Sequence, residues 1–182
     1  MKTLCVTGHR PEGLPWQKDK NHPERLYFLQ LLKKHILYCI SQGYSHFIAG
    51  GALGVDTDFA LTVLDLKKSG YDITLEIAVP CADQNKGWKK DDSQIYNEIL
   101  NKADIVTTLC PHYYPFCMQR RNEYMVNKSD GVLCCWNGIK KGGTYYTIRI
   151  AQKNNKQLLY IDLSKNADNG GNCMIFFKDK IT

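Results

Sequence analysis

Strand-like and helix-like segments alternate along almost the whole chain, and this alternation limits the fold more than any other feature. Short apolar runs of strand length are separated by segments in which apolar residues recur at steps of three and four, as Leu29, Leu32 and Ile36 do. Such an order, repeated five times, predicts a parallel sheet covered by helices on both faces. The expected strands are residues 3–7, 46–49, 73–79, 105–109, 131–136 and 157–161, and the expected helices are 26–40, 59–66, 93–102, 118–128 and 144–153.

The length and composition fit one domain of this kind. The chain has 182 residues, of which 43% are hydrophobic and 23% charged, as in ordinary globular proteins. We therefore expect one α/β domain over residues 1–182, with a Rossmann-like, doubly wound, mainly parallel sheet of about six strands. Residues 164–182 form the tail of this domain, with a candidate edge strand at 174–177. No stretch approaches the roughly 20 apolar residues of a membrane span, and a strand occupies the place of a secretory signal, so we expect a cytoplasmic protein without a membrane partner.

The eight cysteines do not indicate a disulfide framework, because the chain is too large and too regular for one. Several of them, such as Cys5 and Cys134, lie in apolar runs, where a free thiol packs as a small apolar group. Cys110, His112 and Cys117 match no common zinc spacing, so neither a metal nor another cofactor is expected. The net charge of +6 favours anionic ligands without establishing a nucleic-acid binder.

Three glycine-containing turns join a strand to a helix. Glycine allows a tight turn and a close approach of the backbone to a ligand. The N-terminus of a helix offers free N–H groups and the positive end of its dipole, which suits phosphate. The spacing of these glycines matches neither the dinucleotide fingerprint nor the P-loop. The turns are Thr7-Gly8-His9-Arg10, Gly50-Gly51-Ala52-Leu53-Gly54-Val55-Asp56 and Gly142-Gly143-Thr144.

Several of these residues have a structural interpretation beside the functional one. Arg10 can pair with phosphate through its guanidinium, or it can lie exposed in an ordinary turn. Asp56 can stabilise a helix start or bind ribose hydroxyls, and Thr144 can cap a helix or bind phosphate. Arg120 and Glu123 can form a surface ion pair, or Arg121 and its neighbour can face the ligand. The candidate ligand-binding residues are Thr7, Gly8, His9, Arg10, Gly50, Gly51, Gly54, Asp56, Trp88, Arg121, Asn122, Gly142, Gly143 and Thr144.

The same motifs, in this order and spacing, resemble those of the SLOG superfamily, and most of all its small stand-alone YpsA-like proteins. The resemblance rests on residues 5–11, 49–56, 121–123 and 142–144, with further similarity at 86–89 and 127–131, and covers about residues 1–162. The second motif is also similar to the Rossmann-like core of the DNA-processing-A proteins. The resemblance implies a Rossmann-like domain that binds nucleotides or nucleotide-derived ligands, and it does not fix a reaction.

Three functions remain open at this point. The first is a sensor or sequestering module for a small nucleotide derivative, such as ADP-ribose or a signalling nucleotide. The second is an enzyme, a nucleotide N-glycosidase or phosphoribohydrolase, with Asp56 and Glu123 as candidate catalytic carboxylates. The related lonely-guy phosphoribohydrolases carry a glutamate three residues after the threonine of their last glycine motif, where this chain has Thr147. The third is a single-strand nucleic-acid binder whose aromatic loop at 110–117 stacks on bases. A homo-oligomer is compatible with each.

Overall fold

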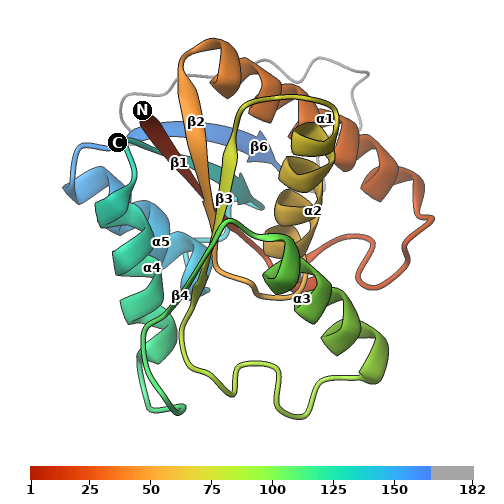
Figure 1. Ribbon diagram of the computed structural model, residues 1–182, viewed down its shortest axis with the longest axis vertical. Coiled ribbons are helices and arrows are strands. Elements are labelled where there is room, and N and C mark those ends of the chain that lie inside the picture. Colours follow the sequence, from red (N-terminus) through yellow and green to blue (C-terminus); the bar gives the residue numbers. More distant parts are fainter. Residues whose placement is uncertain (165–182) are drawn as a thin grey trace.

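The computed structural model describes residues 1–164 and contains a six-stranded, all-parallel sheet in the order β4-β3-β2-β1-β5-β6 (Figure 1). This confirms the predicted fold class, and each strand lies within two residues of its expected bounds. The candidate edge strand at 174–177 lies outside the described residues. The strands are β1 (Lys2–Gly8), β2 (Tyr44–Ala49), β3 (Thr74–Val79), β4 (Ile105–Thr108), β5 (Gly131–Trp136) and β6 (Gln157–Asp162).

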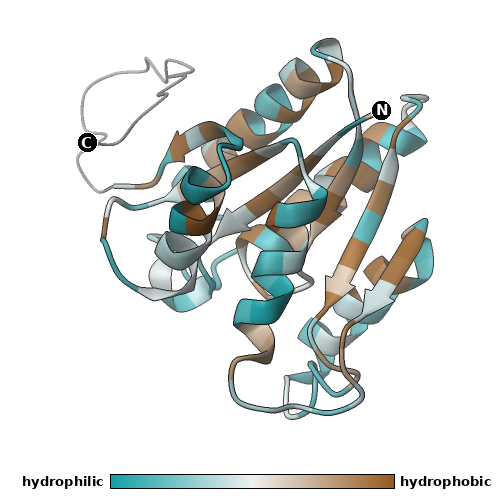
Figure 2. Ribbon diagram, turned by 90° about the vertical axis from the view of Figure 1, so that its left-hand side faces the viewer, coloured by the Kyte–Doolittle hydropathy of each residue, from teal (hydrophilic) through white to brown (hydrophobic). Residues whose placement is uncertain are grey.

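Helices cover both faces of this sheet (Figure 1). α1, α2 and α3 pack on one face around Phe28, Phe47 and Phe59, whereas α4 and α5 cover the other face around Val126 and Ile148. The apolar strands accordingly run through the middle of the molecule, and the polar helix faces point outward (Figure 2). The helices are α1 (Pro23–Ser41), α2 (Val55–Lys68), α3 (Lys90–Lys102), α4 (Cys117–Lys128) and α5 (Gly142–Lys153), with a short 3-10 turn, η1 (Pro11–Gly13).

The strand order reverses at β1, and this reversal positions the site. β1 pairs with β2 on one side and with β5 on the other, so the chain builds outward from the middle of the sheet in both directions. The connections after β1 and β5 therefore leave toward opposite faces. In open parallel sheets, the crevice at such a point, beyond the carboxyl ends of the strands, is where ligands bind.

The cysteines of residues 1–164 are all free thiols, and most of them are buried. Within the same residues, no group of three or more His, Cys, Asp or Glu side chains is placed to hold a metal ion. No helix of the described part of the chain is long and apolar enough to cross a membrane.

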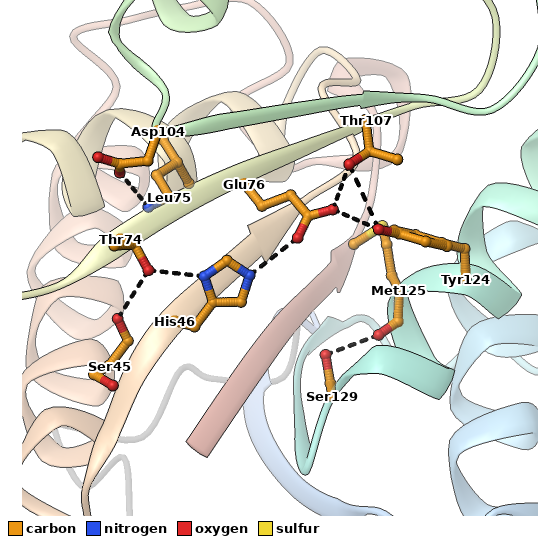
Figure 3. Close-up of polar contacts among 10 residues, drawn as sticks. All are labelled: Ser45, His46, Thr74, Leu75, Glu76, Asp104, Thr107, Tyr124, Met125 and Ser129. Carbon is orange, nitrogen blue, oxygen red and sulfur yellow. Dashed lines mark hydrogen bonds and ion pairs between the residues drawn. The ribbon is translucent and has the colours of Figure 1, made fainter. Parts of the chain in front are cut away.

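A buried polar cluster links β2, β3 and β4 to α4 (Figure 3). Glu76 is only 3% exposed, and its carboxylate accepts hydrogen bonds from His46 Nε2 (3.0 Å), Thr107 Oγ1 (2.8 Å) and Tyr124 OH (2.7 Å). Burial alone would raise the pKa of Glu76, but these hydrogen bonds outweigh it and lower the pKa to about 2. The cluster therefore fixes α4, which carries part of the candidate site, to the sheet.

We expect the stability of the protein to fall in acid because of Glu76. A carboxyl whose pKa is lower in the folded protein stabilises the fold above its usual value, here 4.5, and this contribution is lost as the pH falls toward the folded value of about 2. The loss is worth at most about 3 kcal/mol. Urea unfolding of the wild type and Glu76→Gln between pH 7 and pH 2 measures it. The difference in the free energy of unfolding between the wild type and Glu76→Gln should shrink below about pH 4.5. A difference that stays constant with pH would contradict the prediction.

Candidate functional site

A pocket of about 220 Å³ opens where the strand order reverses, beside the carboxyl end of β1 and the first turns of α2 and α5. Its other wall is α4. The pocket brings together nine of the fourteen candidate ligand-binding residues. It is lined by Val6, Thr7, Gly8, His9, Arg10, Ala52, Leu53, Asp56, Met118, Arg121, Asn122, Met125, Gly143 and Thr144.

The start of α5 forms the open, polar side of the pocket. The helix begins at Gly142, and its N-cap residue, Lys141, makes no capping hydrogen bond with its side chain. Thr144 therefore lies inside the first turn, and the interpretation of Thr144 as the cap is wrong. Gly143 is exposed, and a Cβ placed on it would meet no atom within 4 Å. Space thus remains beside Gly143, at a helix start whose first amides have no partner within the helix.

Arg10, in the turn after β1, lines the same pocket as this helix start. Its side chain is exposed and, within residues 1–164, forms no hydrogen bond or ion pair. Burial raises the pKa of Asp56, and the charge of Arg10 is among the contributions that oppose this rise. An uncommitted guanidinium and an uncapped helix N-terminus therefore lie on one pocket, an arrangement that attracts an anion.

His9 has a structural role in the same turn. Its Nε2 accepts a hydrogen bond from the backbone N–H of Asn137 (3.2 Å), which ties the turn after β1 to the loop after β5. Burial lowers the pKa of His9, and the side chain of Asn137 opposes this effect. The neutral imidazole with its proton on Nδ1 fits this bond, because Nε2 must then act as the acceptor. His9 consequently holds the two sides of the pocket at a fixed spacing.

Arg121 forms the floor of the site rather than a free anion contact. Its side chain is 8% exposed, its Nη1 donates to the carbonyl oxygen of Gly50 and lies 3.5 Å from Asp56 Oδ2, and its Nε donates to Asn122 Oδ1 (2.8 Å). Asp56 Oδ2 also accepts from the N–H of Ala52 (3.2 Å). Burial raises the pKa of Asp56 and lowers that of Arg121, and each group opposes the shift of the other. The pair joins α4 to the turn after β2.

The glycines of this second turn serve internal packing. A Cβ on Gly50 would overlap the Arg121 guanidinium. Gly51 has a φ of +67°, and a Cβ there would approach Ile77 and Tyr96 to 3.1 Å. Gly54 has a φ of +93° and lies where a Cβ would come within 2.5 Å of the His9 carbonyl. The close approach that these glycines permit is therefore to the protein itself, and a bulky substitution at Gly51 would disturb the fold as well as any ligand.

Five candidate ligand-binding residues and one candidate carboxylate do not line the pocket. Trp88 packs edge-on against Tyr96, with ring centroids 5.3 Å apart. Glu123 is exposed and accepts a hydrogen bond from Tyr146 OH (2.7 Å). Asp56 is thus the only one of the two candidate catalytic carboxylates that lies on the pocket. The five candidates outside its lining are Gly50, Gly51, Gly54, Trp88 and Gly142.

Apolar side chains form a part of the pocket that the sequence reasoning missed. Leu53 comes from the turn after β2, and Met118 and Met125 come from α4. The sequence does contain a signal for the two methionines, because positions 118, 121, 122 and 125 have the spacing of one helix face. The two methionines therefore had to share the face of Arg121 and Asn122.

A family model described as the YspA SLOG family matches residues 4–166. UPF0398 protein BH1768 of Halalkalibacterium halodurans is 31% identical over 162 residues, which cover 88% of this chain and 85% of that protein. UPF0398 protein YpsA of Bacillus subtilis is 28% identical over 162 residues, which cover 86% of this chain and 88% of that protein. The matches extend over nearly the whole described part of the chain.

Two solved structures share the fold. DNA processing protein A from Helicobacter pylori, described for its single-stranded DNA binding mode, superposes with a TM-score of 0.61 at 20% identity, over 91% of this chain and 67% of that chain. The X-ray structure of TM1055 superposes with a TM-score of 0.53 at 18% identity, over 87% of this chain and 72% of that chain. At such identities the likeness establishes the common architecture.

Proposed function

This chain belongs to the YspA SLOG family, and we propose that its pocket binds a nucleotide or nucleotide-derived ligand, so that the protein acts as a sensor or sequestering module. The observation that carries the proposal is the pairing of an uncapped helix start with an uncommitted arginine on one pocket. Gly143 and Thr144, in the first turn of α5, and Arg10 all line this pocket. A phosphate between them would gain charge-assisted hydrogen bonds from both sides.

The remainder of the polar wall suits a sugar. Thr7 and Asp56 line the pocket beside Arg10. The Thr7 hydroxyl can donate and accept, and the Asp56 carboxylate can accept hydrogen bonds from ribose hydroxyls. A carboxylate this close to a bound phosphate would repel it if its charge were free, but Arg121 compensates that charge. The pocket therefore accommodates an anionic group and a hydroxyl-bearing group side by side.

We expect AMP to bind the wild type and to bind the Arg10→Ala variant at least about tenfold more weakly, because hydrogen bonds to charged groups contribute about 1.5–3 kcal/mol. Arg10 is exposed, so its removal should leave the unfolding temperature of the free protein unchanged. Isothermal titration calorimetry measures the affinity. AMP at one hundred times its dissociation constant should also add about 2.7 kcal/mol of stability, which a thermal-shift assay detects.

Arg149→Ala provides the matched control, since Arg149 is exposed on α5 and does not line the pocket. It should bind AMP as the wild type does. Equal affinity of the Arg10→Ala variant and the wild type would contradict the proposed phosphate position. ADP-ribose, cyclic nucleotides, inorganic phosphate and a short single-stranded DNA belong in the same screen. If the single-stranded DNA bound far more tightly than AMP, and its affinity fell strongly with salt, the result would contradict a small-molecule ligand and support the binding of single strands.

A nucleotide hydrolase is the second candidate, because Asp56 lies on the pocket. A carboxylate in this position could stabilise an oxocarbenium-like centre at the sugar. Glu123 cannot assist from its exposed position beside Tyr146. Chromatography of each ligand after incubation with the protein separates the two functions: a free base as product supports hydrolysis, and an intact ligand supports binding alone.

A further inference from the structure

The sheet has an open edge at β4. This strand pairs with β3 and with no other strand of residues 1–164, so it is the last strand on its side of the sheet (Figure 1). The contact with β3 extends one residue beyond each end of β4, since the N–H groups of Asp104 and Leu109 donate to the carbonyl oxygens of Leu75 and Val79 (2.9 Å each). An edge strand presents a row of N–H and C=O groups that have no partner in the sheet. Here this row runs along residues 104–109.

Apolar side chains are exposed on this edge. Ile105 is 46% exposed and Val106 is 44% exposed. At the opposite edge of the sheet, by contrast, Leu159 and Ile161 of β6 are buried. The helices on the α4 side of the sheet pack on β1, β3, β5 and β6. Within residues 1–164, β4 is therefore the edge at which both backbone groups and apolar side chains face solvent.

The two exposed apolar side chains lie on opposite faces of the sheet. Thr107 Oγ1 donates to the carboxylate of Glu76 (2.8 Å) and lies 3.5 Å from Tyr124 OH, so the side chain of Thr107 points to the α4 side (Figure 3). Because side chains alternate along a strand, Ile105 shares that face and Val106 lies on the other. A helix packed on one face would leave one of them exposed. A strand added in the plane of the sheet covers both and pairs the free backbone groups as well.

We propose that β4 is the interface of a homodimer, in which the β4 strands of two copies pair antiparallel across a two-fold axis. Such pairing sets each residue of the edge beside the same short segment of the other copy, so a charged side chain there would meet its own charge. Residues 105–109 carry no charge, and they contain neither the lysine nor the proline with which natural proteins block edge pairing. The carboxylate of Asp104 is compensated by Lys67 Nζ (2.5 and 2.6 Å).

The dimer has one continuous sheet, with six strands from each copy. The two-fold axis reverses the direction of the strands in the second copy, so the pockets at the carboxyl ends of the two β1 strands open at opposite ends of the assembly. Each copy keeps its own pocket, and the interface does not depend on the proposed ligand. A short edge strand buries a small area, so we expect a weak dimer with a Kd in about the micromolar range or above.

Sedimentation equilibrium of the full chain at rising concentration tests this interface. The mean mass should rise above the monomer mass of 20.8 kDa and approach twice this value by about 1 mM. Val106→Lys places a charge beside its own copy and should weaken the dimer at least about tenfold. Thr108→Lys, on the same exposed edge, is the second variant with the same expected result. Leu61→Lys is the matched control, because Leu61 is 42% exposed but lies on α2, and it should leave the dimer unchanged.

Hydrogen–deuterium exchange locates the interface, and the unfolding temperature of each variant shows that it is folded. The amides of β4 should exchange more slowly in concentrated than in dilute protein, whereas those of α5 should not change. A protein that stayed monomeric at about 1 mM would overturn the proposal. A dimer that both lysine variants left intact would also overturn it, because the interface would then lie elsewhere. Exchange of β4 that did not vary with concentration would do the same, since the edge would be free or covered by its own chain.

Discussion

Replacement of Arg121 by methionine is expected to lower the free energy of unfolding by about 3–5 kcal/mol. The guanidinium is buried and satisfies the carbonyl of Gly50, the side chain of Asn122 and the charge of Asp56 at once. Methionine keeps much of the side-chain volume and removes all three interactions. It leaves Asp56, which is 8% exposed, as a buried carboxylate without a counterion. Urea unfolding at neutral pH, followed by circular dichroism, measures the loss.

The neighbouring position supplies the control. Arg120 is exposed on the same helix, and the only hydrogen bond of its side chain within residues 1–164 is a long one to Tyr114 OH (3.5 Å). Arg120→Met should therefore change the stability by no more than about 0.5 kcal/mol. The double variant Arg121→Met with Asp56→Asn should recover part of the loss, because it removes both charges together. If the Arg121→Met variant were as stable as the wild type, the buried pair would not hold α4 to the turn after β2.

The fold was predictable from the sequence because each of its elements leaves a local signal. The strands of a sheet buried on both faces read as apolar runs, as residues 131–136 do. In α1 the buried residues Phe28, Leu32, Ile36 and Cys39 recur at steps of three and four. The helix starts were less accurate, since the first turn contains few of the apolar residues that make the period visible. α1 begins at Pro23 and α5 at Gly142, before the expected 26 and 144.

The site was predictable in part, and the limits have a physical cause. Glycine next to a strand end indicates a close backbone approach, but the sequence does not say what approaches. At Gly50 it is the side chain of Arg121, seventy-one positions later in the chain. The apolar lining of the pocket was not predicted, because methionine on a helix face usually signifies core, even where it shares that face with polar candidates as Met118 and Met125 do. Only the tertiary structure shows that Met118 lines a pocket.

The Gly143→Asp substitution is expected to weaken AMP binding by about a hundredfold while it stabilises the free protein. Gly143 lies in the first turn of α5, on the pocket, with no other atom within 4 Å of its Cβ position. A carboxylate there occupies the place that we assign to the phosphate, and like charges in such contact cost several kcal/mol. The same carboxylate interacts favourably with the helix N-terminus, by about 0.3–1 kcal/mol, and replaces a glycine in a helix. Calorimetry and thermal unfolding measure the two effects separately.

The experiment is decisive because Gly143→Asp is expected to raise the stability of the protein and to lower its affinity for AMP. A substitution that merely damaged the fold would lower both, and one that touched no site would leave the affinity alone. Gly143→Ala serves as the size control, because a methyl group in open space should stabilise the helix start and reduce the AMP affinity only a few-fold. If Gly143→Asp bound AMP as tightly as Gly143→Ala, the anion would not lie at the start of α5. The phosphate site would then have to be sought around Arg10 alone.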